Sequence, residues 1–405
     1  MTRPGTRQKA AAALWSGHNE EWRAPEQAAT FWREAADTDP RLLRGRAYGA
    51  WWETIGALGI TVLVSREYEH LLLAMTMTRG GPRVSFMPIP HPSGIAVDRR
   101  GGRVWVASTR NPNQVYEFRP AASRLRRRGA RTHDAGDAKR PLLPVASRLY
   151  PGCLYLHDLA MIGSALHANA VGQNVVVNLD GDAAPVWWPA SVERGGKPDT
   201  TRNHLQLNSI AAGRTLQTSY FSASSDRPGR RRPGDPRYPV KQRGVLFSGR
   251  TRDVVTRGLT RPHSARLLGR ALWVANSGYG EIRRAELPQA TSTVVATGPG
   301  WTRGLSFAAG IGLFGTSRVI PRFQAYAPGL DVGKSVCGVH ALDLLTGRVI
   351  GGYEWPSGNQ IFAVDWVDAQ WTDGLPFPVG ARDRAAETAL FYSFAIEQPS
   401  AAEDL

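Results

Sequence analysis

Cysteine is almost absent from this chain. Cys153 and Cys337 are the two cysteines in 405 residues, and they lie in unrelated contexts without a CxxC pair. This excludes a disulfide framework and a thiolate zinc site. A fold of this length must therefore rest on a hydrophobic core, for which a 42% hydrophobic composition is sufficient.

Long hydrophobic runs are also missing. No stretch approaches the roughly 18 uninterrupted apolar residues that a membrane-spanning helix needs. The opening MTRPGTRQKAAAALWSGHNE is basic but lacks an apolar core, so no secretory signal is predicted. We expect a soluble cytoplasmic protein that does not engage a membrane, of an oligomeric state that the sequence does not indicate.

Acidic residues are in deficit. Fifty Lys and Arg residues face 34 Asp and Glu residues, which gives a formal net charge of +16. Such a surface attracts anions without specifying which. It indicates either an arginine-rich solvated surface or an anionic substrate or partner. Two basic loops, residues 123–140 and 226–244, carry little aromatic interleaving, which makes nucleic acid an unlikely partner.

Turn-forming residues are abundant, with 43 glycines and 28 prolines. Residues 18–57 have the spacing of apolar residues that is typical of helices, and from about residue 60 the pattern changes to short β-rich runs. We predict a helical N-terminal extension over residues 1–57, a β domain over 58–380 and a C-terminal tail over 381–405.

A two-strand unit repeats along the β domain. It begins at residues 92, 156, 207, 262 and 302, and further apolar strands follow each copy. Four strands in each repeat are typical of a propeller blade. NQIFAVDWV from residue 359 has no second strand, and ITVLVS from residue 60 has no opening strand, so the two complete each other. The sequence predicts an all-β, six-bladed β-propeller closed by strands from both ends of the chain, with seven blades as the alternative.

Aligning the repeats places polar side chains in register at the openings of the inner strands. Five blades give Ser93, His157, Asn208, His263 and Arg303, and the sixth gives Gln360 or Ile361. The ends of the second strands give another ring: Ser65, Ser108, Asn169, Ser219, Asn276 and Thr316. Each residue alone is consistent with a strand terminus or a packed histidine. Their recurrence in consecutive blades favours a central site at the rim where both rings lie.

The openings of four consecutive blades contain a histidine each: His91, His157, His204 and His263. These histidines suggest either metal binding or acid–base catalysis. Neutral imidazoles that converge on the axis, together with Asp158, are suitable ligands for a divalent metal ion, the one cofactor that we consider. Without a metal, a His/Asp/Arg group performs acid–base catalysis, with Arg303 holding an oxyanion. We predict as catalytic residues His157, Asp158, His263 and Arg303; as substrate-binding residues Ser93, Asn203, Asn208, Asn276 and Arg318; and as metal ligands His157, His204 and His263, with His91 as a further candidate.

The ordered motifs LHDLA, NHLQLNSIA, GLTRPHSARLLGRALWVANSGYGEI, TRGLSF, GTSR and CGVHALDLLTGRVIGGYEW resemble an uncharacterised bacterial family of conserved hypothetical propeller proteins, some fused to tetratricopeptide repeats. The resemblance covers about residues 50–368 and implies a fold rather than an activity. More distantly, the chain is similar to six-bladed gluconolactonase, paraoxonase and strictosidine-synthase-like propellers, many of which hold a divalent ion or a catalytic acid on the axis.

Two stretches depart from that family pattern. The sixth blade reads SGNQIFAV, with Asn359 and Gln360 where the family has acidic residues. This disfavours calcium and favours imidazole ligation or no metal. SREYEHLLLA, residues 65–74, departs from the usual opening and suggests a specialised branch with its own substrate.

We therefore expect an enzyme of specialised metabolism that acts on a small or peptide-like anionic substrate at the channel mouth, of hydrolase, lyase or cyclase type. Residues 318–336 are a candidate lid over that mouth. The competing hypothesis is a non-catalytic propeller module that binds a protein or an anionic glycan.

Overall fold

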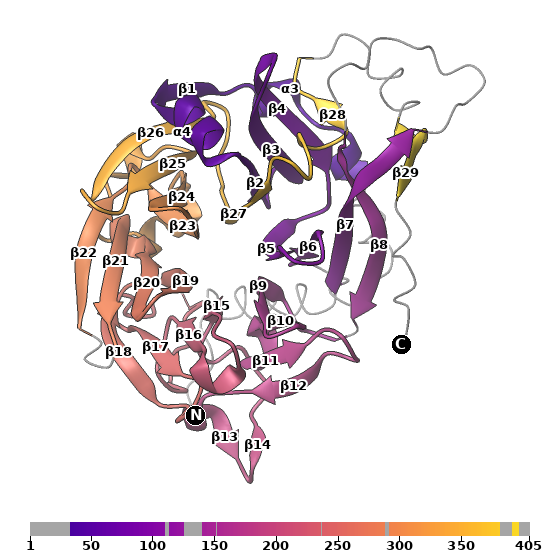
Figure 1. Ribbon diagram of the computed structural model, residues 1–405. Helices are drawn as coiled ribbons and strands as arrows, with labels where there is room; N and C mark the ends of the chain where they lie inside the picture. The colour runs from indigo at the N-terminus through magenta and orange to yellow at the C-terminus, as the bar shows by residue number, and fades with distance from the viewer. Residues whose placement is uncertain are drawn as a thin grey trace.

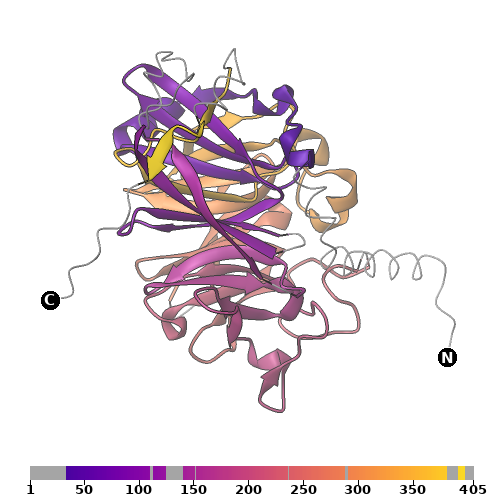
Figure 2. The same cartoon turned by 90° about the vertical axis from the view of Figure 1, so that its right-hand side faces the viewer.

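Six antiparallel sheets of at least four strands surround a central axis in the computed structural model, which describes residues 33–109, 113–124, 140–150, 152–235, 237–287, 291–380 and 391–396 (Figure 1). Seen from the side, the sheets overlap into one thick disc (Figure 2). The arrangement is a six-bladed β-propeller, which confirms the predicted fold and the count of six.

Blades 1 to 5 follow one another along the chain. Blade 1 consists of β5 (Pro92–Asp98), β6 (Arg103–Ser108), β7 (Asn113–Arg124) and β8 (Leu142–Tyr150); blade 2 of β9 (Leu156–Ile162), β10 (Ala165–Ala170), β11 (Val175–Asn178) and β12 (Ala184–Trp187); blade 3 of β15 (Leu207–Ala211), β16 (Tyr220–Ala223), β17 (Gly244–Ser248) and β18 (Val254–Leu259); blade 4 of β19 (Pro262–Leu268), β20 (Ala271–Asn276), β21 (Glu281–Glu286) and β22 (Ser292–Thr297); blade 5 of β23 (Trp301–Ala308), β24 (Ile311–Ser317), β25 (Gly338–Asp343) and β26 (Arg348–Glu354).

Blade 6 is built from both ends of the propeller sequence. It contains β27 (Ala363–Asp368), β2 (Ile60–Arg66), β3 (Leu71–Thr78) and β4 (Gly81–Pro88). The inner strand β27 pairs antiparallel with β2, with Ser65 opposite Ala363. The ring is thus closed by hydrogen bonds within a blade, as the two incomplete repeats predict.

Short elements decorate this ring. A two-stranded hairpin, β13 (Glu193–Arg194) and β14 (Lys197–Pro198), projects outward from the ring of blades after blade 2 (Figure 1). Outer strands β28 (Phe377–Pro378) and β29 (Phe394–Ile396) pair with β4 and β7. The 3-10 helices are η1 (Val171–Gln173), η2 (Ala190–Val192), η3 (Leu216–Thr218), η4 (Ser277–Tyr279), η5 (Pro321–Tyr326) and η6 (Val332–Lys334).

The segment predicted to be helical contains a strand. Residues 1–32 lie outside the described residues. Beyond them α3 (Pro40–Leu43) and α4 (Trp51–Leu58) are helices, but β1 (Arg46–Gly49) pairs with β26 and adds a fifth strand to blade 5. Helical periodicity was therefore the wrong prediction for these four residues, because pairing with an open sheet edge outweighs local sequence preference. No helix among the described residues is long and apolar enough to cross a membrane.

The core lies between the blades. Leu63 of blade 6 packs in one buried cluster with Ile95 and Val106 of blade 1. Trp51 and Ile55 of α4 are fully buried against blades 5 and 6. Because each blade is covered on both faces, a strand next to the inner one, such as β2, is buried at every position rather than at alternate ones.

Candidate functional site

Four consecutive blades open their inner strands through the same strained turn. The residue two positions before the predicted ring residue has a positive φ: 43° at His91, 53° at Tyr155, 52° at Gln206 and 53° at Arg261. A left-handed conformation costs a non-glycine residue about 1 kcal/mol or more. The side chains of Tyr155, Gln206 and Arg261 line a cavity on the propeller axis. The strained backbone conformation thus recurs at residues whose side chains lie at the channel mouth.

A β-bulge lies near the start of the inner strand in five blades, the four with this turn and blade 5. The inner strand loses register with its neighbour between Pro92 and Ile95, Leu156 and Leu159, Leu207 and Ser209, His263 and Arg266, and Arg303 and Leu305. A bulge breaks the strict alternation of a strand and redirects the side chains beside it. The bulges explain why the aligned polar residues can face their neighbouring blade or the axis.

Much of the predicted ring ties the blades together. In the described part of the chain, a side chain at the mouth donates a hydrogen bond to the main chain of the next blade across each of the six blade boundaries. We call this set the girdle. Its bonds are Ser93 Oγ to Leu156 O (3.1 Å), His157 Nδ1 to Asn208 O (3.1 Å), Asn208 Nδ2 to Pro262 O (2.8 Å), Ser277 Oγ to Thr302 O (2.6 Å), Ser317 Oγ to Ile361 O (3.1 Å) and Ser65 Oγ to Ser93 O (2.5 Å).

A partly open cavity of about 110 Å³ lies at the mouth of the channel. Its charged lining consists of the guanidinium groups of Arg261, Arg303 and Arg318 and one carboxylate among the described lining residues, that of Glu67. The imidazoles of His157 and His263, several aromatic rings and the amides of Asn359 and Gln360 complete the wall. The cavity wall therefore has an excess of positive charge.

His157 and Arg303 meet across the axis from opposite blades. Arg303 Nη2 donates to Nε2 of His157 at 2.8 Å, and the Arg303 guanidinium lies 3.3 Å from the centroid of the Phe362 ring. Because Nε2 accepts this bond, the ring proton is on Nδ1, where it meets the carbonyl of Asn208. Burial and the charge of Arg303 lower the pKa of His157 well below its ordinary value. His157 is thus a neutral imidazole, and both of its ring nitrogens are already engaged in hydrogen bonds.

His263 has the same tautomer but a different environment at Nε2. Its Nδ1 lies 2.9 Å from Arg261 O and 3.0 Å from Ser277 Oγ, and the hydroxyl proton of Ser277 is already donated to Thr302 O. Nδ1 therefore carries the proton, and no described residue donates to Nε2. Burial and the charge of Arg303 lower the pKa of His263 well below its ordinary value. The ring presents a neutral acceptor to the cavity that it lines.

Asp158, predicted to be catalytic, is not among the described residues that line the cavity. Its carboxylate pairs with Arg266 through two contacts, at 2.7 and 3.2 Å, and also accepts the main-chain N–H of Ile210 at 3.0 Å. This pair reaches from blade 2 to blade 4, farther along the inner strands than His157 and His263.

Two predicted substrate-binding amides hold turns and are not among the described lining residues. Asn203 Oδ1 accepts the N–H of Gln206 at 2.8 Å, and Asn276 Oδ1 accepts the N–H of Thr260 at 2.5 Å.

Ser219 was misaligned in the second ring. It precedes β16, and the residue opposite Leu207 at the mouth is Ala223. The cause is η3, which lengthens the connection between β15 and β16.

The predicted metal ligands do not converge, which corrects that part of the sequence analysis. His204 Nε2 lies 3.3 Å from Asp199 Oδ2, in a separate surface hollow. His157 and His263 are neighbours, with ring centroids 5.7 Å apart, but the Arg303 guanidinium occupies Nε2 of His157. A cation on the axis would replace that bond and lie beside a fixed positive charge. The residues present therefore do not fit a divalent ion there.

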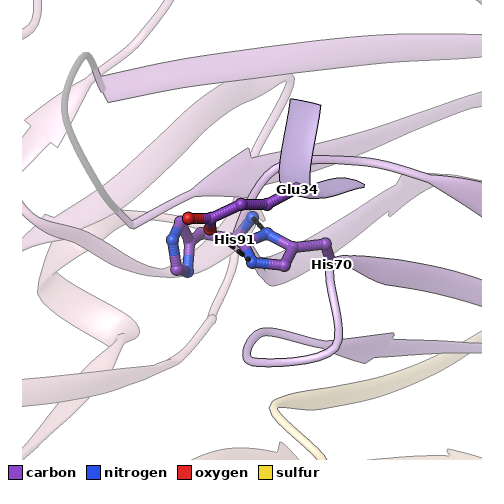
Figure 3. A group of neighbouring side chains, drawn as sticks. All are labelled: Glu34, His70 and His91. Carbon is purple, nitrogen blue, oxygen red and sulfur yellow. Dashed lines mark hydrogen bonds and ion pairs between the residues drawn. The ribbon is translucent and has the colours of Figure 1, made fainter. Parts of the chain in front are cut away.

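A second group of ligand-type residues contains His91. Glu34, His70 and His91 have ligand atoms within 4.8 Å of one another. Figure 3 shows the three side chains gathered together. His70 Nδ1 accepts the main-chain N–H of His91 at 3.1 Å, so the proton of a neutral His70 is on Nε2, which faces Glu34 at 3.4 Å. A metal ion at Nε2 needs the opposite tautomer. The group thus fits a hydrogen-bonded cluster better than a metal centre.

Sequence reasoning did not name several residues of the cavity wall. Glu67 and Tyr68 come from the stretch that departs from the family pattern, which was the available signal. Arg318, predicted to bind substrate, lines the cavity together with Val319, Ile320 and Tyr326. The candidate lid segment therefore contributes directly to the wall.

Comparisons with known proteins agree with the fold. The chain is similar to a chain in the crystal structure of a nidogen/laminin complex (9% identity, 76% of this chain, 98% of that chain, TM-score 0.50). It is also similar to a gluconolactonase from Xanthomonas campestris (14% identity, 74% of this chain, 86% of that chain, TM-score 0.42). A third similar structure is regucalcin, a calcium-binding protein from Agrobacterium tumefaciens (13% identity, 66% of this chain, 75% of that chain, TM-score 0.41). At 9% identity, the likeness to the chain of the nidogen/laminin complex shows the fold alone. A comparison with curated proteins found no match. Residues 49–372 match a family model, and the chain belongs to that family, the domain of unknown function DUF4915.

Proposed function

We propose that the protein is an enzyme of specialised metabolism that acts on a small or peptide-like organic anion in the axial cavity. One observation carries the proposal: three guanidinium groups and a neutral imidazole acceptor line the same cavity. Enclosed cavities with a few convergent polar groups are the usual location of ligand sites. The expected reaction is of hydrolase, lyase or cyclase type.

The charge of Arg303 supports an anionic ligand. Its side chain is buried, and burial lowers its pKa, although the nearby Glu67 carboxylate acts in the opposite direction. The hydrogen-bonding partner of its guanidinium is the uncharged ring of His157. A buried cation is costly unless an opposite charge accompanies it. An anion between Arg303 and Arg318 supplies that charge.

The state of His263 supports a base-assisted reaction. A neutral Nε2 accepts a proton from a water molecule or from a substrate hydroxyl, and the adjacent guanidinium groups stabilise the negative charge that then develops. The hydroxyl of Ser317 also lines the cavity, but it is donated to Ile361 O. We therefore favour direct attack or elimination over a serine-linked intermediate.

A second candidate is a non-catalytic module that binds a protein or an anionic glycan. It is favoured by the girdle, because Ser93, His157 and Asn208 use their polar atoms for bonds between blades. Under this alternative the cavity binds an anionic group of the partner without converting it. The absence of turnover alongside tight, arginine-dependent binding would support it.

The test starts with binding. The full chain is titrated with small carboxylates and phosphates by calorimetry, and mixtures are followed by NMR for turnover. We expect Arg303→Met and Arg318→Met to weaken binding at least about tenfold, because each removes a charge-assisted contact. Arg270→Met is the matched control, since Arg270 is exposed in the turn between β19 and β20. Binding that all three variants retain equally would contradict an anion site on the axis.

A further inference from the structure

We infer that the ligand of the axial cavity is a hydroxy acid: an organic anion that also carries a hydroxyl group and no cationic group. This inference rests on the proposed function and narrows its substrate class. It follows from the kind of hydrogen-bonding group that the cavity wall leaves without a partner. Two of those groups are acceptors, His263 Nε2 and Gln360 Oε1, whereas the charged groups of the wall are mostly donors.

The first acceptor is Nε2 of His263. Two acceptors on the protein, Arg261 O and Ser277 Oγ, fix the proton on Nδ1. The ring cannot reverse this tautomer without placing the Nδ1 lone pair against both oxygens. Nε2 therefore requires a donor, and none of the described residues provides one. A ligand O–H or N–H is the group that completes it.

The second acceptor comes from blade 6. Gln360 lines the cavity with 8% of its surface exposed, and its Oε1 is buried without a hydrogen-bonding partner among the described residues. The main-chain N–H groups of Asn359 and Gln360 are both held by Oε1 of Glu69, at 2.7 and 3.3 Å. The backbone that carries this amide is therefore fixed. A buried acceptor of this kind is retained at a cost unless a donor reaches it.

The charge of the wall decides which donor is suitable. An ammonium group donates hydrogen bonds, but it would enter a cavity lined by Arg261, Arg303 and Arg318 with Glu67 as the one described carboxylate. A keto oxygen carries no proton and would oppose the lone pair on His263 Nε2. A hydroxyl group donates without adding positive charge. Of three otherwise matched acids, the hydroxy acid alone satisfies both the acceptors and the arginines.

The experiment uses matched trios. Lactate, pyruvate and alanine form the first, and malate, oxaloacetate and aspartate the second. Affinities for the full chain are measured by calorimetry at pH 7.5. We expect the hydroxy acid of at least one trio to bind about tenfold more tightly than its keto and amino counterparts. Arginine-dependent binding of the keto or amino acid with equal affinity overturns this inference and leaves the proposed function standing.

Variants separate the hydroxyl contact from simple loss of folding. In His263→Asn, the side-chain amide takes the place of Nδ1 and keeps its donor bonds, while Nε2 is lost. We expect this variant to bind hydroxy and keto acids within about twofold of each other, with the wild-type melting temperature nearly unchanged. Arg270→Met should retain the wild-type preference. Preference retained by His263→Asn overturns the inference, and failure of all six acids to bind overturns both it and the proposed function.

Discussion

At His263 the two ring nitrogens have separate tasks, and two substitutions separate them. Asn preserves a donor at the position of Nδ1, whereas Gln preserves a polar group near Nε2 and removes that donor. Loss of the donor leaves Arg261 O and Ser277 Oγ without the hydrogen bond that each accepts from Nδ1. We expect His263→Gln to lower the free energy of unfolding by about 1–3 kcal/mol. His263→Asn should cost less, and urea unfolding of both variants measures the difference; the reverse order would contradict the assigned tautomer.

Buried neutral histidines also predict how stability depends on pH. Burial lowers the pKa of His157 and His263, and lowers the pKa of His340 to about 4. The unfolded chain takes up protons at these residues near pH 6.5, and the folded chain does not. Acidification therefore favours unfolding, by up to about 1.4 kcal/mol per pH unit for each histidine.

The free energy of unfolding begins to decrease as the pH falls below about 6.5. Urea unfolding at pH 7.5, 6.0 and 5.0 measures it in a range where most carboxylates are still ionised. His340→Gln should reduce the slope, because one titrating group is removed. A free energy of unfolding that stays constant from pH 7.5 to 5.0 would contradict the burial of these imidazoles in neutral form.

At the scale of elements, Arg261 connects two loops over the cavity. Its guanidinium donates to Gln206 Oε1 and to Pro233 O, and lies 3.9 Å from the centroid of the Tyr326 ring. Pro233 belongs to the basic loop of blade 3, residues 226–244, and Tyr326 to the lid segment, residues 318–336. One side chain from blade 4 therefore holds both loops, and burial lowers its pKa to about 10.

Replacing this guanidinium should loosen both loops together. Arg261→Lys keeps a charge but loses the planar fork and its stacking on the ring of Tyr326. We expect faster amide hydrogen exchange at residues 226–244 and 318–336, with the strands of blades 1 and 2 unaffected. Arg257→Lys is the control, because Arg257 is an exposed partner of Asp226 in the same region. Protection unchanged in one of the two loops would show that Arg261 does not connect them.

Elements were predictable from sequence where their pattern was strong. Inner strands are apolar runs between turns, and the repeat therefore revealed the blades and even the shared sixth blade. The pattern failed at β1, whose mostly exposed residues RAYG carry no strand signature. It also failed at Ser219, because a 3-10 helix of three residues changed the spacing of one repeat. Local periodicity does not report pairing with a distant sheet edge.

At the scale of the whole molecule, register predicted which side chains meet at the channel mouth better than it predicted the contacts that each of them makes there. Alignment brought His157, His263 and Arg303 to one rim, and the cavity lies there. The direction of each side chain depends on a bulge and on the next blade, which one sequence does not specify. Asp158 therefore turns to Arg266, while Glu67 enters from a turn outside the repeat.

The girdle makes ring closure a property of the whole molecule. We expect closure to be most sensitive to substitution in blade 6, because no loop connects β27 directly to β2 there. Ser65 Oγ donates to Ser93 O in blade 1 and accepts the N–H of Ala363 at 3.0 Å. Ser65→Ala leaves both main-chain groups buried without that partner, so we expect a loss of about 1–3 kcal/mol in the free energy of unfolding.

Ser147→Ala is the matched control for this substitution, since Ser147 lies exposed on the outer strand β8 and should change stability by less than about 0.5 kcal/mol. Because the seam joins the two ends of the propeller sequence, we expect amide exchange in Ser65→Ala to rise first in β2 and β27, where it becomes faster than global unfolding alone allows. Urea unfolding and hydrogen exchange measure the two effects. Equal stability of the two variants, or faster exchange confined to blade 1, would place the closure of the ring elsewhere than at Ser65.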